Sequence, residues 1–524
     1  MRLGACKMRI RMLALVCTVF VIGGAILAEP VAAATLVVSN ATDVVNGDTS
    51  TPPRLKANPG PDGISLREAL MAVNNRPGPH TITIAKTLAG QTILLTSRLP
   101  MIQRSGISIV GPISGHTGQP QVTIDTRGAT DNAVTMFVGA PSFSLSGLNF
   151  LVRGGVSCIQ IGGSVYGPQG QIIQADKDLF DIRIGESRFS AAGNPGNSFA
   201  VWIVHSVGIT RNAVIRGVTI ENNVFEQLFE AVNAQASGRR NVIQDVVIQR
   251  NSFSQMTQSA TSAVELGVHD GSYNRILGSR VLHNVFTGNF IGVDININRD
   301  AGPPCGCVDT TTTRNVTDDT LIEGNVFTGN LEAIGMGSGV GGPPGFAPIN
   351  NTISNTRIVN NVINRTGFQQ FTSAAGVHVF DNQNGATNNK VKGLSVINNT
   401  INGAGPPGGG LWIESTGGVT GVVVRNTIFW EGGGFGDVTG VPAGNVHNSI
   451  INQTGFTGVD GNFYSDPLFK DAAAGNFHLK NGSPAIRAGA KAGAPAVDLD
   501  CQPRHPRPSI GAYEGNGPNI CPTE

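Results

Sequence analysis

The sequence predicts an all-β protein, a right-handed parallel β-helix, in which each coil of a solenoid contributes three short strands. Three observations predict it: a segment repeated around one asparagine, spacers of variable length, and an unusual composition. Of 524 residues, 70 are glycine and only 6% are aromatic, against a usual glycine share of about 7%. This composition suits short strands joined by tight turns, whereas a helical enzyme would carry more Leu, Glu, Lys and Ala in periodic runs.

Seven segments between residues 218 and 429 align without gaps around one asparagine. Each reads as an alternating strand, a corner of one or two residues, and a second short strand. Asparagine tolerates left-handed backbone geometry and can hydrogen-bond its own backbone, so it suits such a corner. We therefore expect asparagines that stack along the solenoid axis, at Asn223, Asn251, Asn284, Asn325, Asn361, Asn399 and Asn426.

The spacing between successive asparagines differs from one repeat to the next. Helical repeats have nearly fixed periods, so this variation excludes them. A parallel β-helix accepts it, because loops of any length can bulge from a coil without disturbing its neighbours. The pattern predicts about eleven to thirteen coils.

Residues 80–460, with this repeat, resemble the pectate-lyase-like superfamily of right-handed parallel β-helix proteins. That fold hosts lyases, hydrolases, adhesins and phage tail spikes, so the resemblance implies a fold and not one activity. Residues 62–74 (DGISLREALMAVN) resemble the N-terminal "CSLREA" segment of bacterial surface β-helix proteins, and residues 465–490 and 508–514 resemble the closing segment of that secreted group. Both ends then read as caps that protect the end strands.

The N-terminal cap is expected to contain an amphipathic helix over residues 65–73, with its apolar residues on one face. The predicted organisation is a signal peptide at 1–34, an N-terminal cap at 35–80, the β-helix at 81–460, and a C-terminal cap and tail at 461–524.

The first 34 residues read as a secretory signal, with a positive start, an apolar stretch at 12–28 and a small-residue cleavage site at 31–34. An uncleaved membrane anchor is the alternative. No later segment is long and apolar enough to span a bilayer. We expect a protein that is secreted or held at the cell surface, and a monomer.

The charge composition gives no indication of nucleic-acid binding. Lys+Arg number 36 against Asp+Glu 35, a net charge of +1 with 14% charged residues. No basic face for nucleic acid stands out from these values.

Five cysteines remain after the signal. The sequence favours a disulfide between Cys501 and Cys521 as a clasp on the C-terminal tail. The redox state of Cys305 and Cys307 is left open, and no Cys/His pair with suitable spacing supports a zinc site there.

A third strand in each coil alternates strictly, so the residues between its inward aliphatic pairs point outward. The first outward row is Trp202, Asn233, Glu265, Asp294, Gly335, His378 and Trp412. The next is Val204, Gln235, Gly267, Asn296, Gly337, Phe380 and Glu414. If the coils stack in register, neighbours in a row lie about 5 Å apart.

In the superfamily that the repeats resemble, this strand lines a polysaccharide groove. Trp202 and Trp412 are then candidate sugar-stacking platforms, and Asn233, Asn296 and Glu414 candidate substrate-binding residues. Glu265 and Asp294 can share a proton as acid and base, ligate Ca²⁺, or hydrogen-bond sugar hydroxyls. His378 completes the polar centre. Calcium is the one cofactor that the pattern suggests, and none is required.

Several functions stay open from the sequence. A lyase needs a base and a cation near a uronate carboxylate, and Arg275 and Arg299, expected in loops just after the groove strand, are the candidates. Two carboxylates about 5 Å apart suit retaining glycoside hydrolysis, although the motifs of polygalacturonases are absent. A sugar-binding groove without chemistry, a plain polar strand face, and a non-catalytic surface or adhesion stalk are the remaining interpretations. We expect engagement of an extracellular polysaccharide, with a lyase preferred if the protein is an enzyme.

Overall fold

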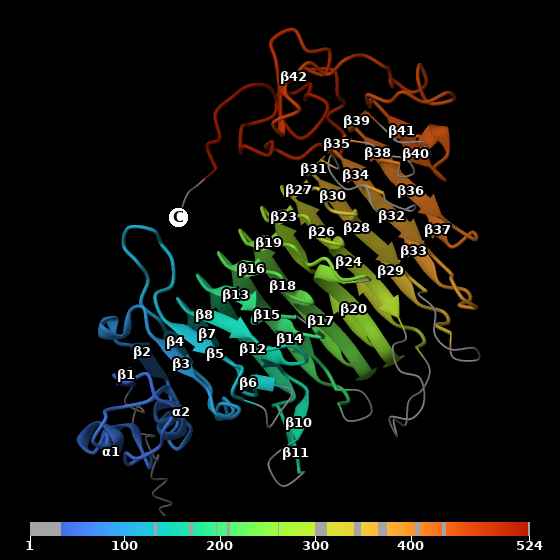
Figure 1. Cartoon of the computed structure of the whole chain (residues 1–524). Helices are drawn as coiled ribbons and strands as arrows, with labels where there is room; N and C mark the ends of the chain where they lie inside the picture. The colour runs from blue at the N-terminus through green and yellow to red at the C-terminus, as the bar shows by residue number, and fades with distance from the viewer. Residues whose placement is uncertain are drawn as a thin grey trace, which may run out of the picture.

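The structure is a computed structural model that describes residues 33–129, 134–166, 171–194, 196–206, 210–259, 261–298, 312–339, 347–364, 375–403, 409–431 and 436–521. Its strands form three long parallel sheets, here named A, B and C, of 18, 11 and 10 strands. The chain visits A, B and C in turn and then returns to A one coil further along, which makes the right-handed parallel β-helix that the sequence predicts (Figure 1).

Sheet A begins each coil. From β21 to β38, each coil's sheet A segment is split into two short strands by a residue in left-handed geometry, such as Gly278 (φ 65°) or Asp319 (φ 54°). Its strands are β1 (Ala34–Val38), β2 (His80–Ile84), β4 (Ile107–Val110), β7 (Phe143–Ser146), β12 (Asp178–Gly185), β15 (Val214–Glu221), β18 (Val242–Gln249), β21 (Arg275–Leu277), β22 (Arg280–Leu282), β25 (Val316–Asp318), β26 (Leu321–Glu323), β29 (Thr352–Ser354), β30 (Arg357–Val359), β33 (Lys390–Lys392), β34 (Ser395–Ile397), β37 (Val419–Thr420), β38 (Val423–Arg425) and β41 (Val446–His447).

Sheet B follows the asparagine corner, and its 11 strands lie in the expected range of coils. They are β3 (Thr92–Leu94), β5 (Thr123–Asp125), β8 (Asn149–Val152), β13 (Arg188–Ala191), β16 (Val224–Glu226), β19 (Ser252–Ser254), β23 (Val285–Thr287), β27 (Val326–Thr328), β31 (Val362–Asn364), β35 (Thr400–Asn402) and β39 (Ile428–Trp430).

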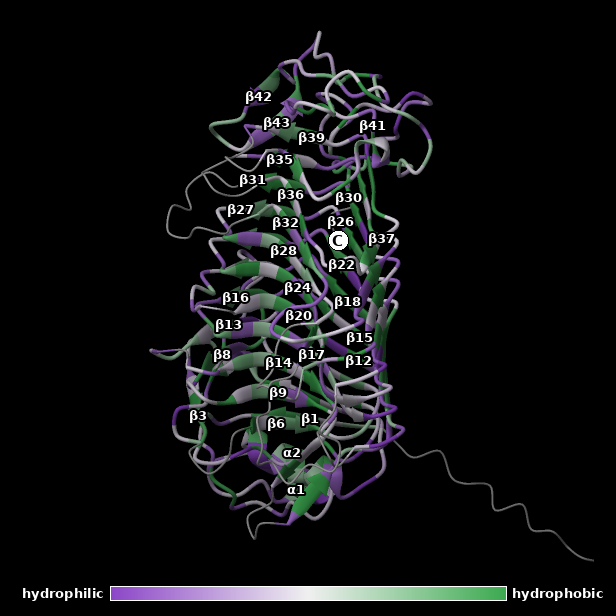
Figure 2. Cartoon of the chain, turned by 90° about the vertical axis from the view of Figure 1, so that its right-hand side faces the viewer, coloured by the Kyte–Doolittle hydropathy of each residue, from purple (hydrophilic) through white to green (hydrophobic). Residues whose placement is uncertain are grey.

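Sheet C carries the predicted groove strand and faces the viewer in Figure 2. Its strands are β6 (Val134–Val138), β9 (Ser157–Ile161), β14 (Phe199–Val204), β17 (Glu230–Arg239), β20 (Ser262–Ser272), β24 (Ile291–Asn298), β28 (Glu332–Gly337), β32 (Val377–Phe380), β36 (Leu411–Glu414) and β40 (Val438–Thr439). The antiparallel pairs β10 (Ser164–Tyr166) with β11 (Ile172–Gln174) and β42 (Phe469–Asp471) with β43 (Asn476–Leu479) lie outside the three sheets.

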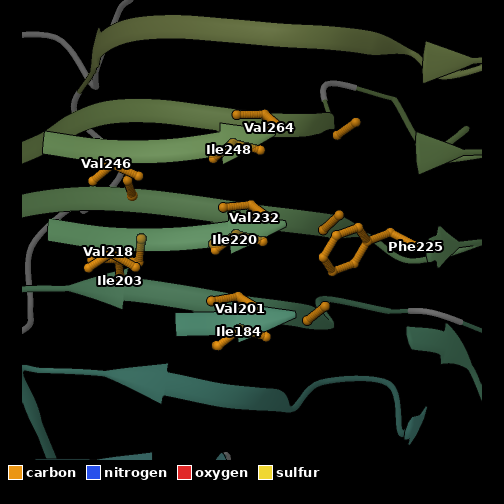
Figure 3. Packing of buried hydrophobic residues seen from close by; sticks show 14 of the residues in the cluster. Ile184, Val201, Ile203, Val218, Ile220, Phe225, Val232, Val246, Ile248 and Val264 are labelled. Carbon is orange, nitrogen blue, oxygen red and sulfur yellow. The ribbon is translucent and has the colours of Figure 1, made fainter. Parts of the chain in front are cut away.

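The core is a set of columns in which like side chains stack from coil to coil. Figure 3 shows the aliphatic columns, with Val201, Val232 and Val264 from sheet C facing Ile184, Ile220 and Ile248 from sheet A. Sheet B supplies phenylalanines whose rings stack with centroids 4.7 to 5.1 Å apart. Their column is Phe150, Phe189, Phe225, Phe253, Phe286 and Phe327.

The predicted asparagine ladder is present at the corner between sheets A and B. Asn284, for example, donates from Nδ2 to Oδ1 of Asn325 at 3.0 Å and accepts at Oδ1 from the backbone N–H of Asn251 at 2.9 Å. The prediction is wrong at its last member. Thr427 continues the ladder, while Asn426 occupies the preceding left-handed position (φ 51°) and donates to Asn398.

The ends of the solenoid are covered, as Figure 1 shows with α1 and α2 at one end and β42 at the other. Helix α1 spans Pro52–Ala57, and α2 spans Leu66–Asn74, with Ser65 and Glu68 forming a capping box at its start. The apolar face of α2 is buried as the sequence predicts. Two short 3₁₀ helices span Lys86–Leu88 and Ala443–Asn445.

A buried arginine is one of several contacts that tie the C-terminal segment to the coils. Arg504 donates to Oδ1 of Asn360 at 2.7 Å and pairs with Glu514 at 3.1 Å. Cys501 and Cys521 form the disulfide that the sequence favours. Among the residues described above, no helix is long and apolar enough to cross a membrane. Residues 1–32 of the predicted signal peptide, and Cys305 and Cys307, lie outside the described residues, while Ala34 begins β1.

Candidate functional site: an acidic pocket on sheet C

The two predicted outward rows are in register across sheet C. Backbone pairing runs from Trp202 through Asn233, Glu265, Asp294, Gly335 and His378 to Trp412. The second row pairs in the same way from Gln235 through Gly267 and Asn296 to Gly337, and onward to Phe380 and Glu414. Candidate residues from seven coils therefore lie on one face.

The expectation that the outward side chains form an open, exposed strand face is wrong. Glu265 and His378 point away from the core, but they are only 5% and 8% exposed. Asp294 is half-buried. The reason is packing between coils: neighbours about 5 Å apart along the row cover one another, and side chains from the start of each strand lie against them. The row is therefore the floor of a pocket and not an open strand face.

The pocket has a volume of about 390 Å³. Acidic and amide side chains line its floor, and aromatic and aliphatic side chains line its sides. It is lined by Phe199, Phe229, Glu230, Asn233, Gln235, Ser262, Glu265, His269, Ile291, Asp294, Asn296, Asn298, Glu332, Gly335 and Phe380.

Two amides bridge three carboxyl groups across the floor. The Nδ2 of Asn233 donates to Oε2 of Glu230 at 2.6 Å and to Oε2 of Glu265 at 2.9 Å. The Nδ2 of Asn296 donates to Oε1 of Glu265 at 3.2 Å and to Oδ2 of Asp294 at 2.8 Å. Because one nitrogen serves both, Oε1 of Glu265 and Oδ2 of Asp294 lie no more than about 6 Å apart, a limit that includes the roughly 5–5.5 Å between the carboxyl groups of retaining glycosidases.

His269 completes this network from the far part of β20. Its Nε2 lies 3.0 Å from Oδ1 of Asn296 and contacts Oε1 of Glu265. Gly267 makes the approach possible, since a Cβ there would stand 2.5 Å from His269 Nε2 and 2.6 Å from Glu265 Oε1. His269 lies within the long strand β20.

Burial and charge repulsion shift the acidities in the pocket. Desolvation, aided by the nearby charge of Glu265, raises the pKa of Asp294 to about 7. The same two causes, in the same order, raise the pKa of Glu230 well above its ordinary value. Two carboxyl groups of the pocket, Asp294 and Glu230, therefore hold their protons to higher pH than free carboxyl groups do.

A second cluster adjoins the pocket one coil beyond Gly335. His378 Nδ1 lies 3.0 Å from Oε1 of Glu332, its Nε2 lies 3.5 Å from Glu414, and its ring stacks on Trp412 at 4.4 Å. Burial acts to lower the pKa of His378, but the hydrogen bond and charge of Glu332, with Glu414, outweigh it and raise that pKa.

At the other end of the row, Trp202 lies half-buried beside the pocket. Its ring stacks on Phe199 with centroids 5.4 Å apart, and its Nε1 donates to Oε1 of Gln235 at 3.1 Å. The two predicted tryptophan platforms thus stand on either side of the carboxyl groups, each held by a neighbouring side chain.

The predicted cations do not join this site. Arg275 does not lie in a loop beside the groove: it begins β21 on sheet A, in register with Val242 and Val316, and it does not line the pocket. Arg299 lies outside the described residues. Among the described residues that line the pocket there is no lysine or arginine.

The Glu265 and Asp294 pair is a poor match to a calcium site. Calcium takes roughly six to eight oxygen ligands, and both Glu265 oxygens already accept from amide nitrogens. No group of three or more His, Cys, Asp or Glu in the described chain is placed to hold a metal ion. Calcium binding stays a prediction.

Sequence reasoning missed Glu230 and Glu332, because strict alternation along the strand would point both inward. The alternation breaks where small buried residues precede the inward valines and isoleucines: Ala200, Ala231, Ala263, Gly292, Ala333 and Gly376. These positions pack tightly against the core; a Cβ on Gly292 would stand 2.8 Å from the Phe327 ring. This column of Ala and Gly is visible in the sequence and could have revealed the break.

Comparison with known proteins finds only distant structural likeness. No family model matches the chain, and no curated protein matches it. Among solved structures, pectate lyase Pel9A is 16% identical, with a TM-score of 0.42 over 92% of this chain and 96% of that one. The endo-xylogalacturonan hydrolase from Aspergillus tubingensis is 14% identical, with a TM-score of 0.33 over 81% of this chain and 97% of that one.

The A-module of the Azotobacter vinelandii mannuronan C-5 epimerase AlgE6 is 12% identical, with a TM-score of 0.27 over 74% of this chain and 97% of that one. The activities in these names belong to those proteins. From its own strand order and register, this chain is a right-handed parallel β-helix, capped at both ends, with an acidic pocket on sheet C.

Proposed function

We propose that this protein is an exported glycoside hydrolase that binds a polysaccharide along sheet C and cleaves it in the acidic pocket. The observation that carries the proposal is the pair Glu265 and Asp294. One amide nitrogen bridges an oxygen of each, so these two oxygens lie no more than about 6 Å apart, and burial with the charge of Glu265 raises the pKa of Asp294 to about 7.

The roles follow from these environments. Asp294, with its pKa raised to about 7, gives its proton to the glycosidic oxygen as the bond to the anomeric carbon breaks. Glu265, held by N–H donors on both oxygens, attacks the anomeric carbon and forms a glycosyl–enzyme bond. Asp294 then takes a proton from water, whose oxygen displaces Glu265 and releases the sugar with retained configuration.

Hydrolysis is favoured over the lyase reaction by the charge of the pocket. A lyase must neutralise a uronate carboxylate next to the carbon that loses its proton. The described pocket lining offers Glu230, Glu265, Asp294 and Glu332 and no basic side chain except His269. A uronate at the cleavage point would meet like charges, so the sugar cleaved there is expected to be neutral.

The test is an assay of residues 35–524 on a panel of neutral and acidic polysaccharides, with and without Ca²⁺. Reducing ends and the absorbance of unsaturated uronate are followed in the same samples. The proposal predicts reducing ends without unsaturated product, at a rate that does not depend on Ca²⁺. Unsaturated product would establish a lyase, and no cleavage of any polymer would favour the non-catalytic stalk; either result contradicts the proposal.

A further inference from the structure

Exposed arginines gather at the corner between sheets C and A, just past the carboxyl ends of the pocket strands. They come from four successive coils, so their backbones span about 14 Å along the solenoid axis at about 4.8 Å per coil. We name this set the arginine ridge: Arg211, Arg239, Arg240, Arg275 and Arg314, with Tyr273 among them.

The ridge is preorganised around one aromatic ring. The guanidinium groups of Arg240 and Arg314 stand over the Tyr273 ring, 5.8 and 5.6 Å from its centroid. Arg314 also donates from Nη1 to the Tyr273 hydroxyl at 2.6 Å. Tyr273 itself is 37% exposed. These contacts hold two cations in place at the surface.

The ridge has no acidic counterpart in the described chain. Several arginines elsewhere are paired, as Arg183 and Arg250 are with Glu221, and Arg280 with Asp319. None of the five ridge arginines forms an ion pair with a described carboxylate, and Arg211 and Arg239 even face each other in backbone register. Like charges opposite each other destabilise a sheet. The pair Arg211 and Arg239 therefore lowers the stability of the folded state.

The backbone at the ridge corner is left-handed in each of these coils. Arg240, Tyr273 and Arg314 have φ values of 57°, 60° and 56°, in the left-handed region that suits asparagine or glycine. The equivalent corners of other coils carry Asn212, Asn350 and Asn388. Where the corner needs only a turn the chain has asparagine, and where it forms the ridge it has arginine and tyrosine.

We infer that the arginine ridge binds an anionic polysaccharide whose carboxylate or sulfate groups lie along the solenoid axis. Arginine suits this ligand because its planar guanidinium pairs with such groups through two N–H donors. The length of the ridge exceeds that of a single small anion. Because the proposed function places a neutral sugar at the point of cleavage, the carboxylate or sulfate groups that bind the ridge would lie on other sugars of the same polymer. The binding itself does not depend on catalysis in the pocket.

The test is binding of the mature protein to immobilised polygalacturonate, with dextran as the neutral comparison, at low and at high salt. The double variant Arg240→Asn/Arg314→Asn should weaken binding to polygalacturonate roughly tenfold, and high salt should weaken wild-type binding too. Asparagine favours the left-handed corner, so the melting temperature should be unchanged or higher. A loss of affinity then reflects the ridge and not unfolding.

The matched control is Arg216→Asn/Arg357→Asn, which removes the same charge from exposed positions of sheet A outside the ridge. It should keep wild-type affinity. Equal affinity of the ridge variant and wild type, or an equal loss in the control, would overturn the inference. So would binding of single-stranded DNA as tight as that of polygalacturonate, since the ridge would then recognise charge density alone. Because binding is measured without turnover, an inactive pocket would leave this result standing.

Discussion

At the residue scale, Asp294 couples the chemistry of the pocket to the stability of the protein. Its pKa in the folded chain is about 7, above the ordinary value of 3.8, because burial and the charge of Glu265 disfavour its ionised form. A carboxyl group whose pKa is raised on folding stabilises the protein fully below its unfolded pKa. That contribution is lost as the pH rises from about 4 through about 7.

The loss of this stabilising contribution with rising pH can be tested with a variant. Asp294→Asn, which does not titrate, should flatten the dependence of melting temperature on pH, and its advantage over wild type should grow between about pH 4 and pH 7. Thermal unfolding followed by circular dichroism at a series of pH values measures this. If the difference between variant and wild type stayed constant with pH, the raised pKa of Asp294 would be wrong.

Gly267 tests the geometry of the pocket without removing any polar group. In Gly267→Ala the new Cβ would stand 2.5 Å from His269 Nε2, 2.6 Å from Glu265 Oε1 and 2.8 Å from Asn296 Oδ1, so these side chains must move. Cleavage should fall about a hundredfold. Gly335→Ala is the comparison, because its Cβ would meet Asp294 Oδ1 at 3.0 Å and Glu332 Oε2 at 3.4 Å, and should cost less. Equal rates in both variants would refute the arrangement.

At the element scale, the asparagine ladder holds the coils together where sheet A turns into sheet B. Asn284 accepts at Oδ1 from the backbone and the side chain of Asn251, and donates to Asn325 and to the carbonyl of Ile248. All these groups are buried, so losing one ladder member leaves several donors and acceptors without partners.

Asn284→Ala should therefore lower the free energy of unfolding by about 3 kcal/mol. Thr287→Ala, at an exposed position of β23 on the same coil, should change it by less than about 0.5 kcal/mol. Chemical denaturation measures both. A loss in Asn284→Ala no larger than that in Thr287→Ala would mean that the ladder is not a source of stability.

The arrangement of the strands was largely predictable from the sequence, whereas part of the pocket was not. The coil order, the ladder and both outward rows were predictable, because a period of two and a repeated asparagine leave little freedom in a parallel stack. Glu230, Glu332 and His269 were not, because they reach the pocket through a break in alternation and a long strand extension. Burial of Glu265 and His378 was missed since it depends on side chains from neighbouring coils.

At the scale of the whole molecule, the solenoid depends on its closed ends. Arg504 is buried at the C-terminal end, with hydrogen bonds to Asn360 of the coils and an ion pair to Glu514. Without it, the C-terminal cap keeps its hydrogen bonds to Asn398 and Thr400 but loses one of its buried links to the stack, which leaves the end strands more open to pairing with another chain.

Arg504→Ala should cost about 3–5 kcal/mol, because it leaves the Glu514 charge and Asn360 without their partner. We expect faster proteolysis of the C-terminal segment and aggregation visible by light scattering. Arg507→Ala, at an exposed position nearby, removes the same charge and should behave as wild type. Equal behaviour of the two variants would show that the cap is held by other contacts.

The most direct measurement of the central claim is the rate of reducing-end release by wild type, Asp294→Asn and Glu265→Gln on the polymer that the panel identifies. The account predicts a loss of at least about a hundredfold in each variant, with the fold intact by circular dichroism. The control Asp245→Asn removes an exposed sheet A carboxylate from a left-handed position (φ 55°) that asparagine tolerates, and should keep the wild-type rate. Wild-type rates in either pocket variant would contradict catalysis by this site.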